Sequence, residues 1–475
     1  MKENSNFFNK IFRWQLVATL YIGIVQLVTI VLLGRFLPYK ELGAFAIFQI
    51  VFRFALYSLD PGMFFSIIQK HESNKSLVKV LFNKQSWYIL SSISVFILIA
   101  CFTDIVSDIG WVILVNSLLI IFIIGYGSYA QCKLTVDFKQ REIVVSQIIA
   151  YSIELIFVLT MCFRFPPMII FTIGVVLRFL IFYSLCYYFI LGIKKQSVIE
   201  IPTTESDESH VTLSKFSVWS QILSFIQGQY DSIIVISLFG LSTLGGYILM
   251  TEISYMIFAK INPLFNKAII PVISKAYKNS QDTSELISHS LISYIYIIFI
   301  FYLLFWVYRT DLIKLAYPEK FQELVYFASY LIPIAFIKAM SNILISYLIS
   351  LGESKRIFHW NIFILIANYI FILVFYWLKS SIDSFLIFGI VYSCLSLITV
   401  YLLLRRCFKL KKVEWINFSP QFYLTLFILF ISVSGIKWLG FYFIWSIALS
   451  IFMIILCLLV LERTRVSNWF RLTIV

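Results

Sequence analysis

Residues 217–232 read SVWSQILSFIQGQYDS, a polar set inside a run that is otherwise almost entirely apolar. Successive residues of an α-helix are about 100° apart, so a helix here gathers its polar residues within an arc of about 120°. That face carries Ser217, Ser220, Gln221, Ser224, Gln227, Gly228 and Asp231. Whether the face meets water or protein depends on the rest of the chain.

The composition answers this question. The chain is 61% hydrophobic and 13% charged, whereas a soluble domain is about half apolar and about a quarter charged. Apolar runs of about 18 or more residues recur from end to end, which is the pattern of transmembrane helices. The sequence therefore predicts an all-α polytopic membrane protein. The polar face points inward, because a carboxylate at mid-bilayer costs about 2.5–3.5 kcal/mol and normally faces a bundle interior or a wet cavity.

We predict fourteen membrane spans, and a count of twelve, in which the last pair does not cross the membrane, is the alternative. The spans are 14–34, 44–66, 86–103, 111–131, 143–163, 168–190, 216–240, 244–270, 288–308, 324–351, 358–378, 384–404, 421–436 and 440–461.

The basic residues of the loops predict the orientation. With the N-terminus inside, cytoplasmic segments carry 25 Lys and Arg residues and outer loops carry 8. The positive-inside rule then places both termini in the cytoplasm. These loops account for the net charge of +14 without a nucleic-acid partner. The first apolar run is too long for a cleavable signal peptide. The seven cysteines are scattered, without a CxxC pair, and predict no disulfide or metal framework.

The chain is predicted to hold two halves. The polar stretch 194–215 forms a cytoplasmic linker between a lobe at 1–193 and a lobe at 216–405, and 406–475 holds a basic loop, the last two spans and a tail. The span that Trp14 opens ends LLGRFLPYKELGAF, and the span that Trp219 opens ends SLFGLSTLGGY, which matches if three residues are dropped. Two six-span halves are then parallel repeats, with substrate between them near the midplane.

Charged residues inside the spans are the candidate site, because an intramembrane ionisable residue is a functional hypothesis by default. Gln49, Arg53 and Asp60 share one face of the second span within about 40°. For every charged residue the competing interpretation is a salt bridge that only holds helices together, and Glu154 and Asp231 are expected to pair with Arg178 and Lys338 in that case. Lys267 is expected to reach the headgroups instead. The substrate-binding candidates are Arg53, Lys260, Arg178, Lys338, Gln49 and Gln227, and the ion-coupling candidates are Asp60, Asp231, Glu252 and Glu154.

The sequence lacks the common motifs for nucleotide binding, metal binding and hydrolase catalysis. The sequence contains no P-loop, HExxH, CxxC or G-x-S-x-G pattern. The longest outer segment, about 309–323, is too short for a catalytic domain. We therefore expect no enzyme, metal or cofactor, with H⁺ or Na⁺ as candidate coupling ions. The 48 Phe and 28 Tyr are attributed mostly to lipid-facing bulk and interfacial belts.

Ordered sequence stretches then indicate a family. LLGRFLPYKELGAFAIF followed by SLDPGMFFSIIQK resembles the opening of bacterial polysaccharide transporters. QYDSIIVISLFGLSTLGGY, NPLFNKAIIPVISKAY and SYLISLGESKRIFHWNI agree in the second half, so that the resemblance covers about 1–375. The branch is that of the Wzx-type O-antigen and exopolysaccharide flippases, in the superfamily that also holds multidrug exporters. Asp60-Pro61 stands where many relatives have Asp-Leu.

The resemblance implies a two-lobed, V-shaped α-helical transporter in the bacterial cytoplasmic membrane. It would flip undecaprenyl-pyrophosphate-linked oligosaccharide for O-antigen of lipopolysaccharide, for capsule or for exopolysaccharide by alternating access. Membrane lipids, a polysaccharide polymerase and a chain-length regulator would be its partners. The alternatives are a multidrug or small-molecule exporter of the same fold and, from a different class, a membrane-embedded ligase or polymerase. Buried bases outnumber buried acids five to four, which favours an anionic lipid over a drug cation.

Overall fold

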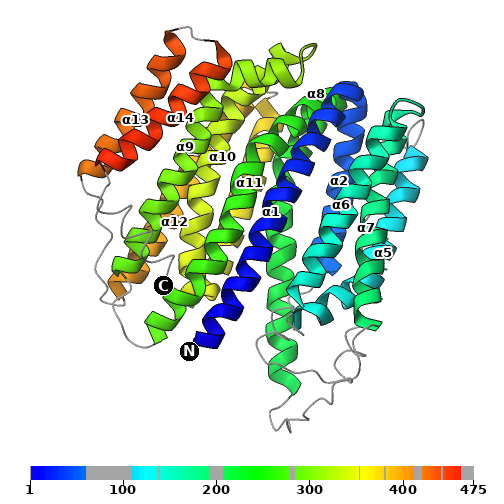
Figure 1. The fold of residues 1–475 in the computed structure, drawn as a ribbon, viewed down its shortest axis with the longest axis horizontal. Coiled ribbons are helices and arrows are strands. Elements are labelled where there is room, and N and C mark those ends of the chain that lie inside the picture. The colour runs from blue at the N-terminus through cyan, green and yellow to red at the C-terminus, as the bar shows by residue number, and fades with distance from the viewer. Residues whose placement is uncertain are drawn as a thin grey trace. The chain divides into compact units, whose positions relative to one another are not determined.

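The computed structural model describes residues 2–59, 110–136, 139–191, 207–278, 284–351, 353–378, 381–410, 420–439 and 442–461. Every regular element within those ranges is an α-helix (Figure 1). The helices are α1 (Lys2–Phe36), α2 (Tyr39–Leu59), α5 (Gly110–Val136), α6 (Gln140–Met161), α7 (Pro167–Leu191), α8 (Asp207–Lys278), α9 (Ser284–Ala316), α10 (Phe321–Ser350), α11 (Ser354–Leu378), α12 (Ile382–Leu410), α13 (Pro420–Trp438) and α14 (Phe443–Leu461).

The predicted all-α, multi-pass membrane fold is confirmed. Thirteen of the fourteen predicted spans lie wholly or partly on these helices, and the span at 86–103 lies outside the described residues. Helix α13 is itself long and apolar enough to cross a bilayer. The described part of α14 that was searched, Phe443–Cys457, is a shorter apolar helix, so the choice between fourteen and twelve spans stays a prediction.

Helix α1 shows why these apolar helices fit a bilayer. Ala18, Ile22 and Val25 are buried, whereas Leu20 and Ile24 are 59% and 66% exposed. In water such exposed aliphatic side chains would be costly, but in a bilayer they meet hydrocarbon. Both faces of the helix can therefore be apolar, and only the inward face is selected for packing.

Helix α8 is a hairpin of two spans. Tyr247 Oη donates a hydrogen bond of 2.9 Å to Asp231 Oδ2, although the two residues are 16 positions apart in the chain. In a straight helix that separation is about 24 Å. The chain reverses at Gly240, whose φ of 84° and ψ of 175° are not helical. A left-handed φ carries no Cβ penalty for glycine, so the residue suits this turn.

Two glycines let the hairpin turn pack against the start of α2. A Cβ on Gly43 would lie 2.1 Å from the Leu241 carbonyl oxygen, and a Cβ on Gly245 would lie 2.1 Å from the Tyr39 carbonyl oxygen. The contact is reciprocal, and the two glycines occupy matching places in the sequence repeat. Only a residue without a side chain fits at either position.

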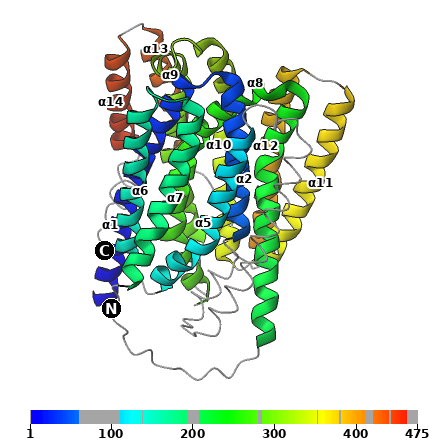
Figure 2. The same ribbon diagram turned by 90° about the vertical axis from the view of Figure 1, so that its right-hand side faces the viewer.

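By packing, the chain forms two compact units. Unit 1 is Met1–Leu249 with Asn361–Val374, and unit 2 is Met250–Trp360 with Phe375–Val475. In unit 1, α7 packs against α5 and α6, and α1 packs along α6 (Figure 2). In unit 2, α9 packs against α10 and α13, α10 against α12, and α13 against α14. The predicted lobes 1–193 and 216–405 follow the sequence repeat, whereas these units follow packing, so the two divisions describe different properties.

Candidate functional site

A buried ion pair joins α6 and α7 in unit 1. Arg178 Nη1 lies 3.0 Å from Glu154 Oε2 and 3.2 Å from Oε1, and the two side chains are 14% and 3% exposed. The Arg178 Cζ atom lies 4.8 Å from the centroid of the Tyr151 ring and 4.9 Å from that of Phe179. The guanidinium is thus neutralised at one nitrogen and has two aromatic rings close by, an arrangement that stabilises a cation away from water.

Helix α1 positions one of those rings. Gln26 Nε2 donates to Tyr151 Oη at 3.1 Å, and the hydroxyls of Tyr21 and Ser152 lie 2.5 Å apart. Within the described part of the chain, Arg178 Nε and Nη2 have no hydrogen-bond partner. The pair is therefore oriented from three helices, and one edge of the guanidinium remains able to donate to an acceptor.

Asp231 lies inside the α8 hairpin. Its side chain is 5% exposed. Besides the Tyr247 hydroxyl, the backbone N–H of Ser232 donates to Asp231 Oδ1 at 2.9 Å. Of these two hydrogen bonds, the one from Tyr247 connects the two arms of the hairpin.

Lys338 lies on α10 in unit 2, where phenol groups join three helices. Its Nζ donates to Tyr255 Oη of α8 at 2.6 Å. Tyr302 of α9 donates to the Ser254 carbonyl of α8 at 2.8 Å. Tyr294 of α9 donates to Asn262 Oδ1 of α8 and, at 3.1 Å, to the Ala339 carbonyl of α10. Lys338 thus lies beside a set of tyrosine hydrogen bonds that connect α8, α9 and α10.

The other candidates are distributed over both units. Gln49 and Arg53 are half-buried, one turn apart on α2, and Glu252 and Lys260 are half-buried on the second arm of α8. Gln227 belongs to the first arm of α8, and Asp60 lies outside the described residues. The structure brings Glu154 and Arg178 together, as expected if the two residues form a salt bridge between helices. In the described ranges no three His, Cys, Asp or Glu side chains gather as metal ligands.

Sequence reasoning missed the tyrosines that hold the charged residues. Tyr151, Tyr247 and Tyr255 contact Arg178, Asp231 and Lys338, whereas the sequence analysis attributed most aromatic residues to lipid contact. The sequence feature that could have identified two of these tyrosines is a spacing of one helical turn from an acidic residue. Tyr151 lies one turn before Glu154 on α6, and Tyr255 lies one turn after Glu252 on α8, so each phenol shares a face with a charge.

The comparisons with known proteins agree with this architecture. A family model described as "Polysaccharide biosynthesis protein" matches residues 32–326. No curated protein matches the sequence.

Solved transporter structures share the fold at low sequence identity. The lipid II flippase MurJ, in an inward closed conformation, is 15% identical with a TM-score of 0.69, over 95% of this chain and 99% of that one. An inward-facing multidrug resistance MATE family transporter of the MOP superfamily is 14% identical with a TM-score of 0.60, over 83% and 99%. A MOP superfamily transporter from Pyrococcus furiosus, described as having a binding pocket of reverse polarity, is 14% identical with a TM-score of 0.58, over 85% and 97%.

Proposed function

The chain belongs to the polysaccharide biosynthesis protein family, and from this premise we propose that it is a flippase for undecaprenyl-pyrophosphate-linked oligosaccharide. The flipped unit would supply O-antigen, capsule or exopolysaccharide synthesis at the bacterial cytoplasmic membrane. The observation that carries the proposal is the family match, combined with a fold shared along almost the full length of a lipid II flippase.

The charged residues support an anionic substrate. A pyrophosphate needs donors inside the membrane, and Arg53, Lys260 and Lys338 are each partly exposed on α2, α8 and α10. Arg178 is largely committed to Glu154, so we assign it an orienting role with one edge left for an acceptor. Gln49 and Gln227 are candidate contacts for sugar hydroxyls.

Ion coupling belongs to the same proposal. Of the four candidate acids, Glu154 is the least suited to exchange H⁺ or Na⁺, because Arg178 lies against both of its oxygens. Asp231 is buried inside the α8 hairpin, where the Tyr247 hydroxyl and the Ser232 N–H donate to its carboxylate. We therefore propose Asp231, with Glu252 and Asp60, as the carboxylates through which the ion gradient acts.

The second candidate function is export of drugs or other small molecules, which the MATE fold of the neighbours supports. The exporter would work without a lipid-linked glycan. A membrane ligase or polymerase, the third alternative, would transfer sugar to an acceptor.

Reconstitution separates these functions. Purified protein in proteoliposomes is given a prenyl-pyrophosphate oligosaccharide, and the fraction accessible to an external glycosidase is followed over time. We expect movement of the glycan lipid that depends on the protein and on an imposed H⁺ or Na⁺ gradient. Efflux of drug cations without glycan movement would select the exporter, and new glycosidic bonds would select the enzyme.

A further inference from the structure

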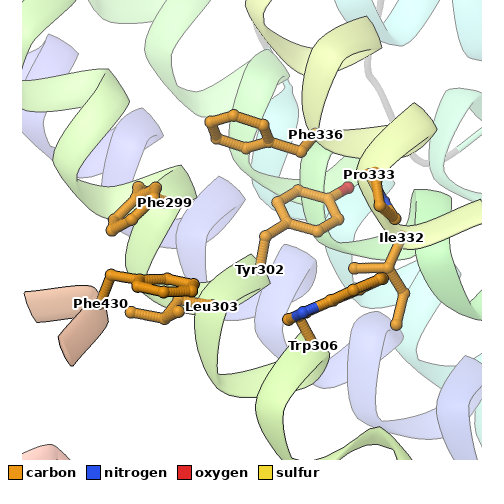
Figure 3. A pocket seen from close by; sticks show the side chains of 8 residues that line it. All are labelled: Phe299, Tyr302, Leu303, Trp306, Ile332, Pro333, Phe336 and Phe430. Carbon is orange, nitrogen blue, oxygen red and sulfur yellow. The ribbon is translucent and has the colours of Figure 1, made fainter. Parts of the chain in front are cut away.

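Unit 2 contains an apolar pocket among three helices. It is lined by Phe299, Tyr302, Leu303 and Trp306 of α9, Ile332, Pro333 and Phe336 of α10, and Phe430 of α13. Figure 3 shows Phe430 beside Phe299 and Leu303, with Ile332 and Pro333 on the other side near Trp306. All three helices are long and apolar enough to cross a membrane.

The lining excludes a polar ligand. Tyr302, the one lining residue with a hydroxyl, donates it to the Ser254 carbonyl, so that only its ring faces the pocket. The pocket volume is about 140 Å³, close to that of an apolar cavity that stays dry and binds benzene, about 150 Å³. A pocket of this size between apolar helices suits a short length of hydrocarbon chain, with the rest of the chain left in the bilayer.

A cation lies one turn beyond the pocket. Arg309 Cζ is 4.3 Å from the centroid of the Trp306 ring, and Nη1 donates to the Trp306 carbonyl at 2.7 Å. Arg309 Nε donates to Ser329 Oγ of α10 at 3.2 Å. Ser329 precedes Pro333 by one turn, so Arg309 bridges α9 and α10 at one end of the pocket. Among the described residues, Arg309 Nη2 has no hydrogen-bond partner.

The neighbouring acid does not neutralise this cation. Asp311, two residues after Arg309, forms an ion pair with Lys437 of α13. Lys437 also lies 5.3 Å from the centroid of the Tyr308 ring. Since Asp311 is already paired, the end of the pocket keeps the positive charge of Arg309, which complements an anionic headgroup.

We propose that this pocket is a binding site for an anionic phospholipid, with one acyl chain among α9, α10 and α13 and the phosphate at Arg309. An apolar pocket with one guanidinium at its end matches the chemistry of such a lipid, a hydrocarbon chain ending in a charged phosphodiester. The lipid would fill the space that α13 leaves against α9 and α10 and so stabilise unit 2.

A resident phospholipid fits better than the glycan lipid of the proposed function. The pocket holds only a short chain segment, and phospholipids surround the protein at high concentration, so that occupancy follows by mass action. The site therefore does not depend on the proposed transport activity. A prenyl phosphate in the pocket is the competing outcome.

Lipid titration of the purified protein tests the proposal. Affinities for phosphatidylglycerol and phosphatidylcholine are measured in detergent by native mass spectrometry, which also identifies co-purified lipid by mass. We expect the wild type to bind phosphatidylglycerol more tightly. Arg309→Gln should weaken phosphatidylglycerol binding about tenfold, as loss of a charged hydrogen bond predicts. Phosphatidylcholine binding should weaken less, because the choline cation already offsets the charge of its phosphate, so the preference for phosphatidylglycerol should shrink. Ile332→Phe should fill the pocket and weaken both.

Matched controls are Arg164→Gln, an exposed arginine on the turn between α6 and α7, and Ile398→Phe, on the exposed face of α12. Both should bind lipid as the wild type does. If Ile332→Phe fails to fold, Arg309→Gln alone decides, because it changes no buried volume in the lining. An unchanged preference for phosphatidylglycerol in Arg309→Gln overturns the proposal, and so does a retained mass that matches a prenyl phosphate.

Discussion

The Glu154–Arg178 pair makes a prediction at the scale of single residues. Breaking a buried pair leaves one charge without its partner and costs about 3–5 kcal/mol, whereas replacing both by apolar residues of similar volume is often neutral. Glu154→Gln and Arg178→Met should therefore each lower the thermal stability and the membrane abundance of the protein. The double variant Glu154→Met/Arg178→Met should restore most of both. Fluorescence-detected size exclusion after heating measures this.

The same double variant separates packing from function. If it is abundant and exports glycan at the wild-type rate, the pair only holds α6 against α7. If it is abundant and inactive, the open edge of Arg178 contributes to transport. A double variant that is less stable than both single variants would contradict the assignment of the pair as a compensated charge.

Asp231 makes the second prediction. Asp231→Asn keeps an oxygen that can accept from Tyr247, so we expect a folded hairpin and wild-type abundance. If Asp231 titrates during transport, ion-driven flipping should fall in this variant, because an amide cannot carry the proton. Tyr247→Phe is the matched change, which removes the donor and should cost about 1–3 kcal/mol of stability while leaving a titratable acid. Wild-type pH dependence of transport in Asp231→Asn would exclude Asp231 from coupling.

Asp231 and Arg178 show which features of single residues can be predicted from the sequence. Arg178 was a candidate because it is a charge inside an apolar run, and the helical period placed Asp231 on an inward polar face. It could not name Tyr247 or Glu154 as partners, because a period defines the face of one helix and not the neighbour across it. Glu154 was considered as a partner only because few buried acids were available, and its distance from Arg178 came from the packing of α6 on α7.

The glycines at the α2–α8 contact give a prediction at the scale of elements. Gly43→Ala or Gly245→Ala would place a methyl group 2.1 Å from a backbone carbonyl oxygen, which a flexible side chain cannot relieve. Because the backbones must separate, each change should lower the melting temperature by an amount corresponding to about 1–3 kcal/mol.

Gly228→Ala is the matched control on the first arm of α8. A Cβ there meets no atom within 4 Å, and alanine gains about 0.5–1 kcal/mol over glycine inside a helix. Its stability should therefore stay equal or rise. If all three variants melt alike, the close contact between the α2 start and the α8 turn does not support the fold.

Element boundaries were predictable where length alone decides them. The predominantly apolar stretch Gly228–Asn266 is 39 residues long, about 58 Å as a straight helix against a hydrocarbon thickness of about 30 Å. Two spans, 216–240 and 244–270, were therefore required, and the reversal at Gly240 agrees. The reciprocal contact of Gly43 with Leu241 was not predictable, because the sequence repeat aligns the glycines without indicating that they meet.

Orientation belongs to the scale of the whole molecule, and only the charge distribution predicts it. Folded helices pack equally well in either direction across the membrane, so the packing within each unit carries no information on sidedness. The distribution of 25 against 8 basic residues does, because cytoplasmic loops retain Lys and Arg during insertion. This asymmetry therefore predicts that both termini lie in the cytoplasm.

Cysteine labelling tests the orientation. Cysteines introduced at Ser206, in the predicted cytoplasmic linker, and at Ser381, exposed just before α12, are treated in intact cells with a membrane-impermeant thiol reagent. We expect Ser381→Cys to react and Ser206→Cys to react only after the cells are opened. Cys162, Cys186, Cys394, Cys407 and Cys457 are free and buried or half-buried, and the parent protein provides the labelling background. Labelling at Ser206 but not at Ser381 in intact cells would contradict the predicted orientation.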